Sequence, residues 1–284
     1  MIPAAFDYVA PATLAEALDV LAEHGDSAKI LAGGQSLLPI LRMRLNAPEL
    51  LVDLGKVSEL RGVFDDGPGI VIGAMTRYDE LLADPLAREH AKLLIDAVET
   101  VADAQIRHRG TVGGALAHAD PAGDVGAPML ALDASFVIVG PRGQRVVAGE
   151  DFFEDTFTTA VGDDEILAAI RVPKHTGWGT RYEKFVRVSH QWSIVAVAAA
   201  VRVEGDTIAE ARVGLTNMGT VPLRAHAVEQ SLVGVRLDEE SVGAACAAAA
   251  EGTNPPSDLN ADADYRRHLA TVLTRRAVLA AAGA

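Results

Sequence analysis

The stretch Ala32-Gly33-Gly34-Gln35-Ser36 follows the short apolar run 28–31 and precedes a second apolar run over 37–41. Two adjacent glycines allow a backbone to approach a ligand closely with its N–H groups exposed. Successive N–H groups in such a turn form a concave anion site, to which the Ser36 hydroxyl can add one more bond. An ordinary strand-to-helix turn has the same pattern, so this stretch alone leaves both interpretations open.

A second glycine turn, Thr111-Val112-Gly113-Gly114-Ala115, again joins two glycines to a hydroxyl residue. Two such turns facing each other would satisfy the two phosphates of a diphosphate without any lysine. The chain has neither the Gly-Lys-Ser/Thr of a Walker loop nor a dinucleotide G-x-G-x-x-G after a strand. The pair of turns therefore indicates a diphosphate site of another kind, with two structural turns as the alternative.

The region around the first turn has the pattern of a small α/β unit. Thr13 and Glu16 have capping-box spacing, apolar residues follow at helical spacing, and Gly25 ends the pattern. Apolar strands are expected over residues 28–31 and 50–53. A strand, a helix and a further strand in this order predict an α/β subdomain that ends near residue 55.

The middle of the chain has the pattern of an antiparallel or mixed sheet with helices. Thr76 and Asp79 are expected to cap a short helix near Leu81, and a longer helical pattern covers Ala87–Ala102. Short strands are expected over residues 70–72, 136–139, 145–147 and 166–172. The segment Pro173–Gly179 is rich in Pro, Gly and His, which marks a domain boundary.

Beyond this boundary the pattern changes again. Three antiparallel strands are expected over residues 182–188, 193–203 and 208–215, and alanine-rich helices near 239–250 and 263–282. We therefore expect an α+β fold of two domains. Residues 1–176 would form a two-part domain, split near 55 into a small α/β subdomain and a mixed or antiparallel sheet subdomain. Residues 177–284 would form a C-terminal domain with a three-stranded antiparallel sheet and helices.

Composition excludes several classes of function. The formal net charge of -14 argues against binding nucleic acid or an anionic membrane, because both need a basic face. No stretch approaches the ~20 apolar residues of a membrane span, and the first residues lack a signal-peptide pattern, so a cytoplasmic protein is expected. The single cysteine, Cys246, excludes an internal disulfide and an iron–sulfur cluster held by four thiolates of this chain.

The two glycine turns, at this spacing and with the second continuing to Asp124, resemble the FAD pyrophosphate loops of a known family. These are the FAD-binding (medium) subunits of the carbon monoxide dehydrogenase and xanthine dehydrogenase family of molybdenum hydroxylases. The resemblance covers nearly the whole chain. It includes Phe6-Asp7-Tyr8, Leu51-Val52-Asp53-Leu54, Ile72-Gly73-Ala74-Met75-Thr76, Asp164-Glu165-Ile166-Leu167 and Tyr182-Glu183-Lys184-Phe185.

The resemblance implies that the first domain is an FAD-binding domain of the PCMH type. Backbone N–H groups of Ala32–Ser36 and Thr111–Ala115 would hold the pyrophosphate. Asp124 would bond a ribityl or ribose hydroxyl; the plain alternative is a carboxylate at a helix start. The family often has His where this chain has Gln35, and Asn where it has Ala115. Backbone contacts would be unaffected by either change, but a side-chain bond would be missing at Ala115.

The resemblance also assigns residues to the flavin ring. Val101 and Leu167 would lie against the flavin or the adenine, although core packing explains them nearly as well. Lys184 would place its positive charge where it stabilises an anionic reduced ring; the alternative is a solvated strand lysine. Trp192 would cover the isoalloxazine, or else pack between domains.

The implied function is electron transfer within a complex. A small subunit would hold two [2Fe-2S] clusters and a large subunit the molybdopterin cofactor, in a dimer of heterotrimers. Electrons would pass through the clusters to FAD on this chain and on to an external acceptor. The alternatives are a stand-alone FAD-dependent oxidase or reductase, which needs a substrate cap with acid–base residues, and a non-catalytic nucleotide-binding module.

Overall fold

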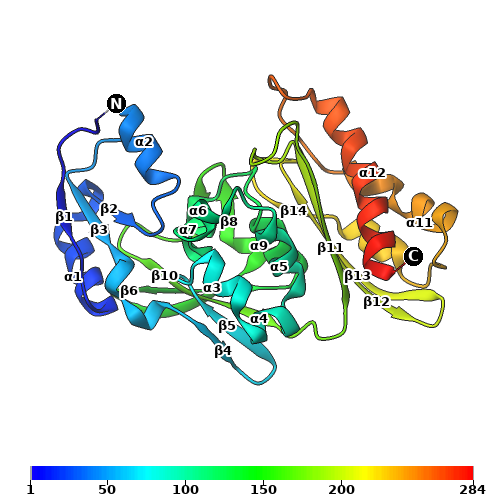
Figure 1. The fold of residues 1–284 in the computed structure, drawn as a ribbon, viewed down its shortest axis with the longest axis horizontal. Helices are drawn as coiled ribbons and strands as arrows, with labels where there is room; N and C mark the ends of the chain where they lie inside the picture. The colour runs from blue at the N-terminus through cyan, green and yellow to red at the C-terminus, as the bar shows by residue number, and fades with distance from the viewer. Residues whose placement is uncertain (1, 284) are drawn as a thin grey trace.

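The computed structural model describes residues 2–283, and in it three main sheets follow one another along the molecule (Figure 1). The first is a parallel sheet of β1 (Asp7–Val9), β3 (Leu50–Asp53) and β2 (Ala28–Leu31), in that order, with α1 (Leu14–His24) and α2 (Leu37–Met43). The hydroxyl oxygen of Thr13 accepts from Glu16 N at 3.2 Å and Gly25 ends α1, as predicted.

The second sheet is antiparallel, with strand order β4-β5-β10-β6-β7. Its strands are β4 (Val63–Asp65), β5 (Gly69–Gly73), β6 (Ser135–Gly140), β7 (Gly143–Ala148) and β10 (Ile166–Pro173). Short helices cover it: α3 (Tyr78–Ala83), α4 (Pro85–His90), α5 (Lys92–Glu99), α6 (Ala104–Arg107), α7 (Val112–His118), α8 (Gly126–Ala131) and α9 (Gly149–Phe152). A two-stranded hairpin of β8 (Phe153–Asp155) and β9 (Thr158–Thr159) lies beside them. The sequence predicts β5, β6, β7 and β10 of this sheet but does not predict β4.

Two helix predictions in this region are wrong. The pattern over 87–102 forms two helices, α4 and α5, because Ala91 leaves the helical conformation at φ -131 and ψ 43. The expected cap at Thr76 is absent, since the Thr76 hydroxyl donates to Gly62 O at 3.1 Å. Arg77 caps α3 instead, with Glu80 accepting from its backbone N–H at 2.9 Å.

The C-terminal domain has a four-stranded antiparallel sheet, one strand more than expected. Its strands are β11 (Gly179–Phe185), β12 (Val195–Glu204), β13 (Thr207–Thr216) and the two-residue β14 (Leu223–Arg224). The helices are α10 (His226–Leu232), α11 (Glu239–Ala245) and α12 (Ala263–Ala282), with a 3-10 turn over Cys246–Ala250. The short β14 and α10 carry no alternation or periodicity long enough to predict them.

Strand β12 is buried on both faces. Ala196, Ala198 and Ala200 join the core of the N-terminal domain, whereas Val195 and Val197 join the core under α12. Alternate side chains of a strand point to opposite faces, so one strand serves both cores. The sheet approaches closely on the alanine side: a methyl group built on Gly214 would lie 2.3 Å from Ala127 O.

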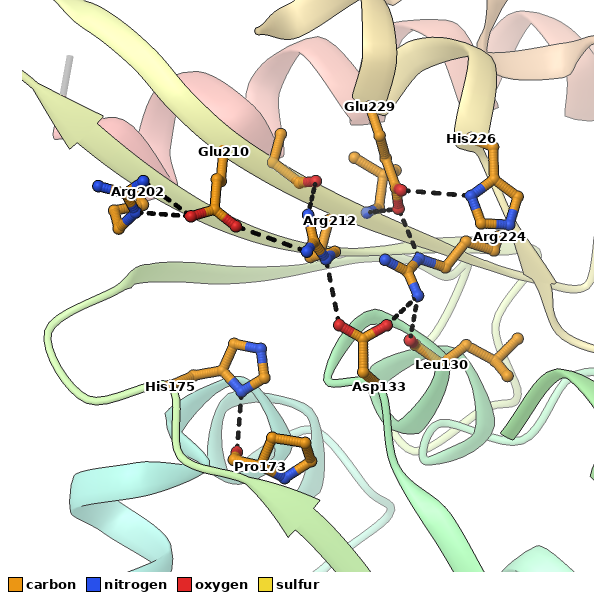
Figure 2. Close-up of polar contacts among 12 residues, drawn as sticks. Leu130, Asp133, Pro173, His175, Arg202, Glu210, Arg212, Arg224, His226 and Glu229 are labelled. Carbon is orange, nitrogen blue, oxygen red and sulfur yellow. Dashed lines mark hydrogen bonds and ion pairs between the residues drawn. The ribbon is translucent and has the colours of Figure 1, made fainter. Parts of the chain in front are cut away.

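Charged side chains also join the two domains, as Figure 2 shows. Asp133, in the turn after α8, bonds Arg212 of β13 at 3.2 Å and also pairs with Arg224 of β14. Arg224 Nε lies 2.7 Å from Glu229 Oε1 on α10. Burial acts to raise the pKa of Asp133, but the two guanidiniums outweigh it and the net pKa is lowered.

Candidate functional site

The first glycine turn joins β2 to α2 and offers free backbone donors. Within residues 2–283, the N–H groups of Gly33, Gly34, Gln35 and Ser36 donate no hydrogen bond. Gly34 has a φ of +74°, in the region that favours glycine, and the Gln35 side-chain amide donates to Gly33 O at 3.0 Å. Side chain and backbone together thus hold an open turn whose amides are available to an anion.

The structure brings the two glycine turns into contact. A methyl group built on Gly33 would lie 2.4 Å from Arg109 O and 2.8 Å from Gly110 Cα, just before the second turn. A methyl group built on Gly114 would lie 3.0 Å from the Ala32 Cβ. Gly33 is therefore required for the two turns to meet, rather than only for the approach of a ligand.

The second turn differs from the first, because four of its five amides, those of 112–115, already have partners. Thr111 is the N-cap of α7 and its hydroxyl oxygen accepts from Gly114 N at 3.1 Å. The three other N–H groups donate to backbone carbonyls: Val112 to Thr76 O, Gly113 to Ala74 O and Ala115 to Thr111 O. The resemblance assigns the pyrophosphate to the amides of Thr111–Ala115, and in this structure those of 112–115 already donate to partners within the chain.

Gly113 is a glycine for a structural reason. A methyl group built on it would lie 2.4 Å from the Ala74 Cβ and 2.7 Å from Ala74 O, so α7 packs directly on the chain that follows β5. Gly113 is buried, whereas Gly114 and Ala115 are half-buried. The part of the second turn that borders the first turn is therefore its Gly114–Ala115 side.

Asp124 is the centre of a buried polar cluster between the domains. Its Oδ2 lies 2.7 Å from Lys184 Nζ, and its Oδ1 accepts from the hydroxyls of Tyr182 at 2.9 Å and Ser193 at 3.0 Å. Lys184 Nζ also donates to Thr100 O at 3.3 Å. Burial raises the pKa of Asp124, and the neighbouring ammonium and hydroxyls oppose that rise.

This cluster changes the interpretation of two expected site residues. Asp124 has no helix to cap, because α8 begins two residues later at Gly126 and its N-cap is Val125. Lys184 is not a solvated strand lysine, since only 9 % of its side chain is exposed. Its charge is compensated by Asp124, so a flavin beside it would meet an ion pair rather than a lone cation.

The three apolar candidates lie in different surroundings. Leu167 is buried in β10 opposite Ile138, at a bulge in the strand. Val101 is half-buried after α5, and its carbonyl accepts from Arg107 at 2.7 Å. Trp192 is 58 % exposed, in the loop between β11 and β12. In this structure Trp192 is therefore largely exposed, rather than packed between the two domains, which was the plain alternative for it.

Several residues of this region had no assigned role in the sequence. They are Thr100, Arg109, Gly110, Ser193 and Asn217, and Tyr182 entered only as part of a motif. Asn217 follows β13 in a left-handed conformation with φ +62, which asparagine tolerates better than most residues. An Asn-x-Gly sequence after a strand is the one local signal that could have drawn attention to it.

Other kinds of site find little support in the described part of the chain. Residues 2–283 contain no group of three or more His, Cys, Asp and Glu side chains placed to hold a metal ion. Cys246 is buried, and burial raises the pKa of its thiol to about 12. None of the helices described combines the length and the apolar character needed to cross a bilayer.

Comparison with known families agrees with this geometry. Residues 4–175 match the family model of the FAD binding domain in molybdopterin dehydrogenase. Residues 180–281 match the model of the CO dehydrogenase flavoprotein C-terminal domain. Between them the two models cover nearly the whole chain.

Individual relatives match over their full length. The chain is 39% identical to the carbon monoxide dehydrogenase medium chain of Hydrogenophaga pseudoflava, covering 99% of this chain and 98% of the relative. It is 35% identical to the glyceraldehyde dehydrogenase medium chain of Sulfolobus acidocaldarius, covering 98% of each. A solved carbon monoxide dehydrogenase of H. pseudoflava matches with a TM-score of 0.96, at 40% identity over 100% of this chain and 99% of that one. Quinoline 2-oxidoreductase of Pseudomonas putida 86 matches with a TM-score of 0.94, at 35% identity over 100% of this chain and 99% of that one. The chain therefore belongs to the family of FAD-binding medium subunits of molybdopterin dehydrogenases, with the carbon monoxide dehydrogenase type of C-terminal domain.

Proposed function

We propose that this chain binds FAD at the joined glycine turns and transfers electrons within a larger molybdenum hydroxylase complex. The observation that carries the proposal is the run of four unbonded backbone N–H groups over Gly33–Ser36. Unpaired amides are costly unless water or a ligand satisfies them, and a pyrophosphate oxygen suits several convergent donors. The site therefore fits the diphosphate of FAD without any lysine or arginine.

The parts of the site divide among the parts of the cofactor. The amides of Gly33–Ser36 and the hydroxyl of Ser36 would hold the pyrophosphate, with Ala32, Gly114 and Ala115 forming its border. Thr111, Val112 and Gly113 would act indirectly, by building the start of α7 against Ala74. The free amides of the first turn are thus assigned to the ligand, and the start of α7 to the scaffold that supports them.

The remaining candidates would surround the rest of the cofactor. Asp124, with lone pairs beyond those used in its cluster, would accept from a ribityl or ribose hydroxyl. Val101 and Leu167 would supply apolar and backbone contacts to a ring. The Lys184–Asp124 pair would tune the electrostatics beside the flavin, and Trp192 would cover one of its faces.

The partner subunits would supply the chemistry that this chain lacks. FAD, when bound, accepts electrons and releases them to an acceptor. A small subunit with [2Fe-2S] clusters would deliver these electrons, and a large subunit with molybdopterin would oxidise the substrate. The single buried cysteine supports this division, because the chain cannot hold such clusters. We further infer a cytoplasmic dimer of heterotrimers, with domains over 1–176 and 177–284.

A comparison of FAD with riboflavin tests the site. Riboflavin lacks the diphosphate, so the complex should bind FAD at least about 100-fold more tightly, as expected for two or more charge-assisted hydrogen bonds. Binding is followed by flavin absorbance during titration of the flavin-depleted complex. Equal affinity for the two ligands, or no flavin binding, would refute the assignment of the glycine turns.

A further inference from the structure

Asn217 connects two segments that are distant in the sequence and close to the candidate flavin site. Its backbone N–H donates to Pro121 O at 2.9 Å, in the loop between α7 and Asp124. Its side-chain amide donates to Ser193 O at 2.8 Å and to Ile194 O at 3.3 Å. The residue is 9 % exposed and has a φ of +62°. One residue of the C-terminal domain therefore ties the loop after the second glycine turn to the loop that carries Trp192.

The Ser193–Ile194 end of this loop has further buried anchors. The Ser193 hydroxyl donates to Asp124 Oδ1, and the Ile194 carbonyl also accepts from Arg266 of α12. Only 1 % of the Arg266 side chain is exposed, and its second terminal nitrogen lies 2.8 Å from Asp258 Oδ2. Asn217, Asp124 and Arg266, from three separate parts of the chain, thus converge on two consecutive residues, Ser193 and Ile194.

The rest of the same loop is free of such anchors. Residues 187–192 are exposed, and His190 lies in a left-handed conformation at φ +69. Within residues 2–283, the only hydrogen bond found from this stretch is that of Gln191 N to Val188 O at 3.3 Å. The anchors nearest to Trp192 therefore lie on its C-terminal side, at Ser193 and Ile194.

We propose that Asn217 is a positioning residue, which fixes Trp192 against the flavin by holding the Ser193 and Ile194 carbonyls in register with Pro121. This inference rests on the function proposed above. Buried carbonyls that lose a donor must find water or move, so removal of the amide loosens the loop from this end. The fold itself keeps its ladder, because Asn217 lies just beyond β13.

Two substitutions separate the side chain from the backbone conformation. Asn217→Gly keeps the left-handed conformation and the N–H to Pro121 but removes the amide. Asn217→Asp keeps the size of the side chain and its tolerance of φ > 0. Its carboxylate oxygens would face the Ser193 and Ile194 carbonyl oxygens and repel them, so this variant should loosen the loop more than Asn217→Gly does. Phe157→Gly is the matched control, since it also removes a side chain at positive φ (+56), and Phe157 is 55 % exposed.

The loop is probed directly in the full chain by limited trypsin digestion at Arg187, which lies in the exposed stretch. Cleavage should be roughly five- to tenfold faster in Asn217→Gly than in wild type, as expected for the loss of one buried hydrogen-bonded group, and unchanged in Phe157→Gly. Thermal unfolding is measured alongside. If Asn217→Gly fails to fold, the rate of cleavage at Arg187 is measured on Asn217→Asp instead.

The flavin is probed in the assembled complex by FAD affinity and by bound-flavin fluorescence, which a stacked indole quenches. Asn217→Gly should weaken FAD binding about tenfold and raise flavin fluorescence, while the melting temperature stays close to wild type. Trp192→Phe should reproduce the fluorescence change without faster cleavage at Arg187. A loosened loop with unchanged FAD affinity and fluorescence would overturn the positioning role and leave the flavin site intact. Failure of the wild-type complex to bind FAD would overturn both, and unchanged cleavage in both Asn217 variants would overturn this inference alone.

Discussion

Lys184 Nζ lies 2.7 Å from Asp124 Oδ2, with only 9 % and 4 % of the two side chains exposed. The two residues are 60 positions apart in sequence and belong to different domains. Two opposite charges removed from water stabilise each other, but either one alone in the same place is strongly unfavourable. The pair is therefore a fixed electrostatic element at the joint between the domains, beside Thr100 and Ser193.

Replacement of one partner should show this dependence. Lys184→Met leaves the Asp124 carboxylate buried with two hydroxyl donors and no cation, so the free energy of unfolding should fall by about 3 kcal/mol. The double variant Lys184→Met, Asp124→Asn should recover part of this loss, because no buried charge then remains. The double-mutant cycle is completed by urea unfolding of wild type, Lys184→Met, Asp124→Asn and the double variant. Additive effects of the two substitutions would contradict a coupled pair.

Glu165 predicts a specific dependence of stability on acid. The carboxylate accepts from Arg145 Nε at 3.0 Å and from Gly162 N at 2.9 Å, and the Arg145 guanidinium leads in holding its pKa at about 2. The folded pKa lies below the ordinary value of 4.5. The stabilisation that the ionised Glu165 gives to the folded state is therefore complete above pH 4.5, and it is lost as the pH falls towards 2.

The size of this effect is measurable by urea unfolding between pH 6 and pH 3. The contribution of Glu165 should amount to about 2 kcal/mol at neutral pH, allowing for the partial exposure of Arg145. Glu165→Gln should lower stability at pH 6 and flatten the slope in the acid range. A variant with the same slope as wild type would show that other carboxylates account for it. Glu165 matters for the site because it holds the start of β10, the strand that carries Leu167.

Gly113 should be required for the stability of the fold, because α7 packs directly on Ala74 at this position. Gly113→Ala places a methyl group 2.4 Å from the Ala74 Cβ, and overpacking of this kind typically costs about 1–3 kcal/mol. Gly243→Ala is the matched control: this glycine lies inside α11, where a methyl group meets only the Arg275 side chain at 3.3 Å. That variant should be more stable by about 0.5–1 kcal/mol. Equal melting temperatures for wild type and Gly113→Ala would contradict the close packing of α7.

The thiol of Cys246 should be inert in the folded protein. It is fully buried and burial raises its pKa to about 12, so little thiolate is present at pH 8. Reaction with a disulfide reagent should be at least about 100-fold slower in buffer than in urea, because it requires opening of the structure. Fast labelling under native conditions would place the residue at the surface.

Local signals in the sequence were sufficient for much of the fold. The Thr13 cap, the Gly25 stop and the apolar runs of β10 and β12 depend on neighbours within a few residues, so they can be recognised from the local sequence alone. The two glycine turns can likewise be recognised from a few consecutive residues. The single cysteine is a fact of composition that no fold can change.

Only the tertiary structure decided how these parts are used. The sequence gives no reason to distinguish the free amides of Gly33–Ser36 from the occupied ones of Val112–Ala115, because partners such as Ala74 O are brought in by packing. The same holds for Asp124, whose cluster needs Tyr182, Lys184 and Ser193 from another domain. Hydrogen-bond partners that lie far apart along the chain are fixed by the docking of whole elements, and local sequence patterns extend only one helical turn or one strand.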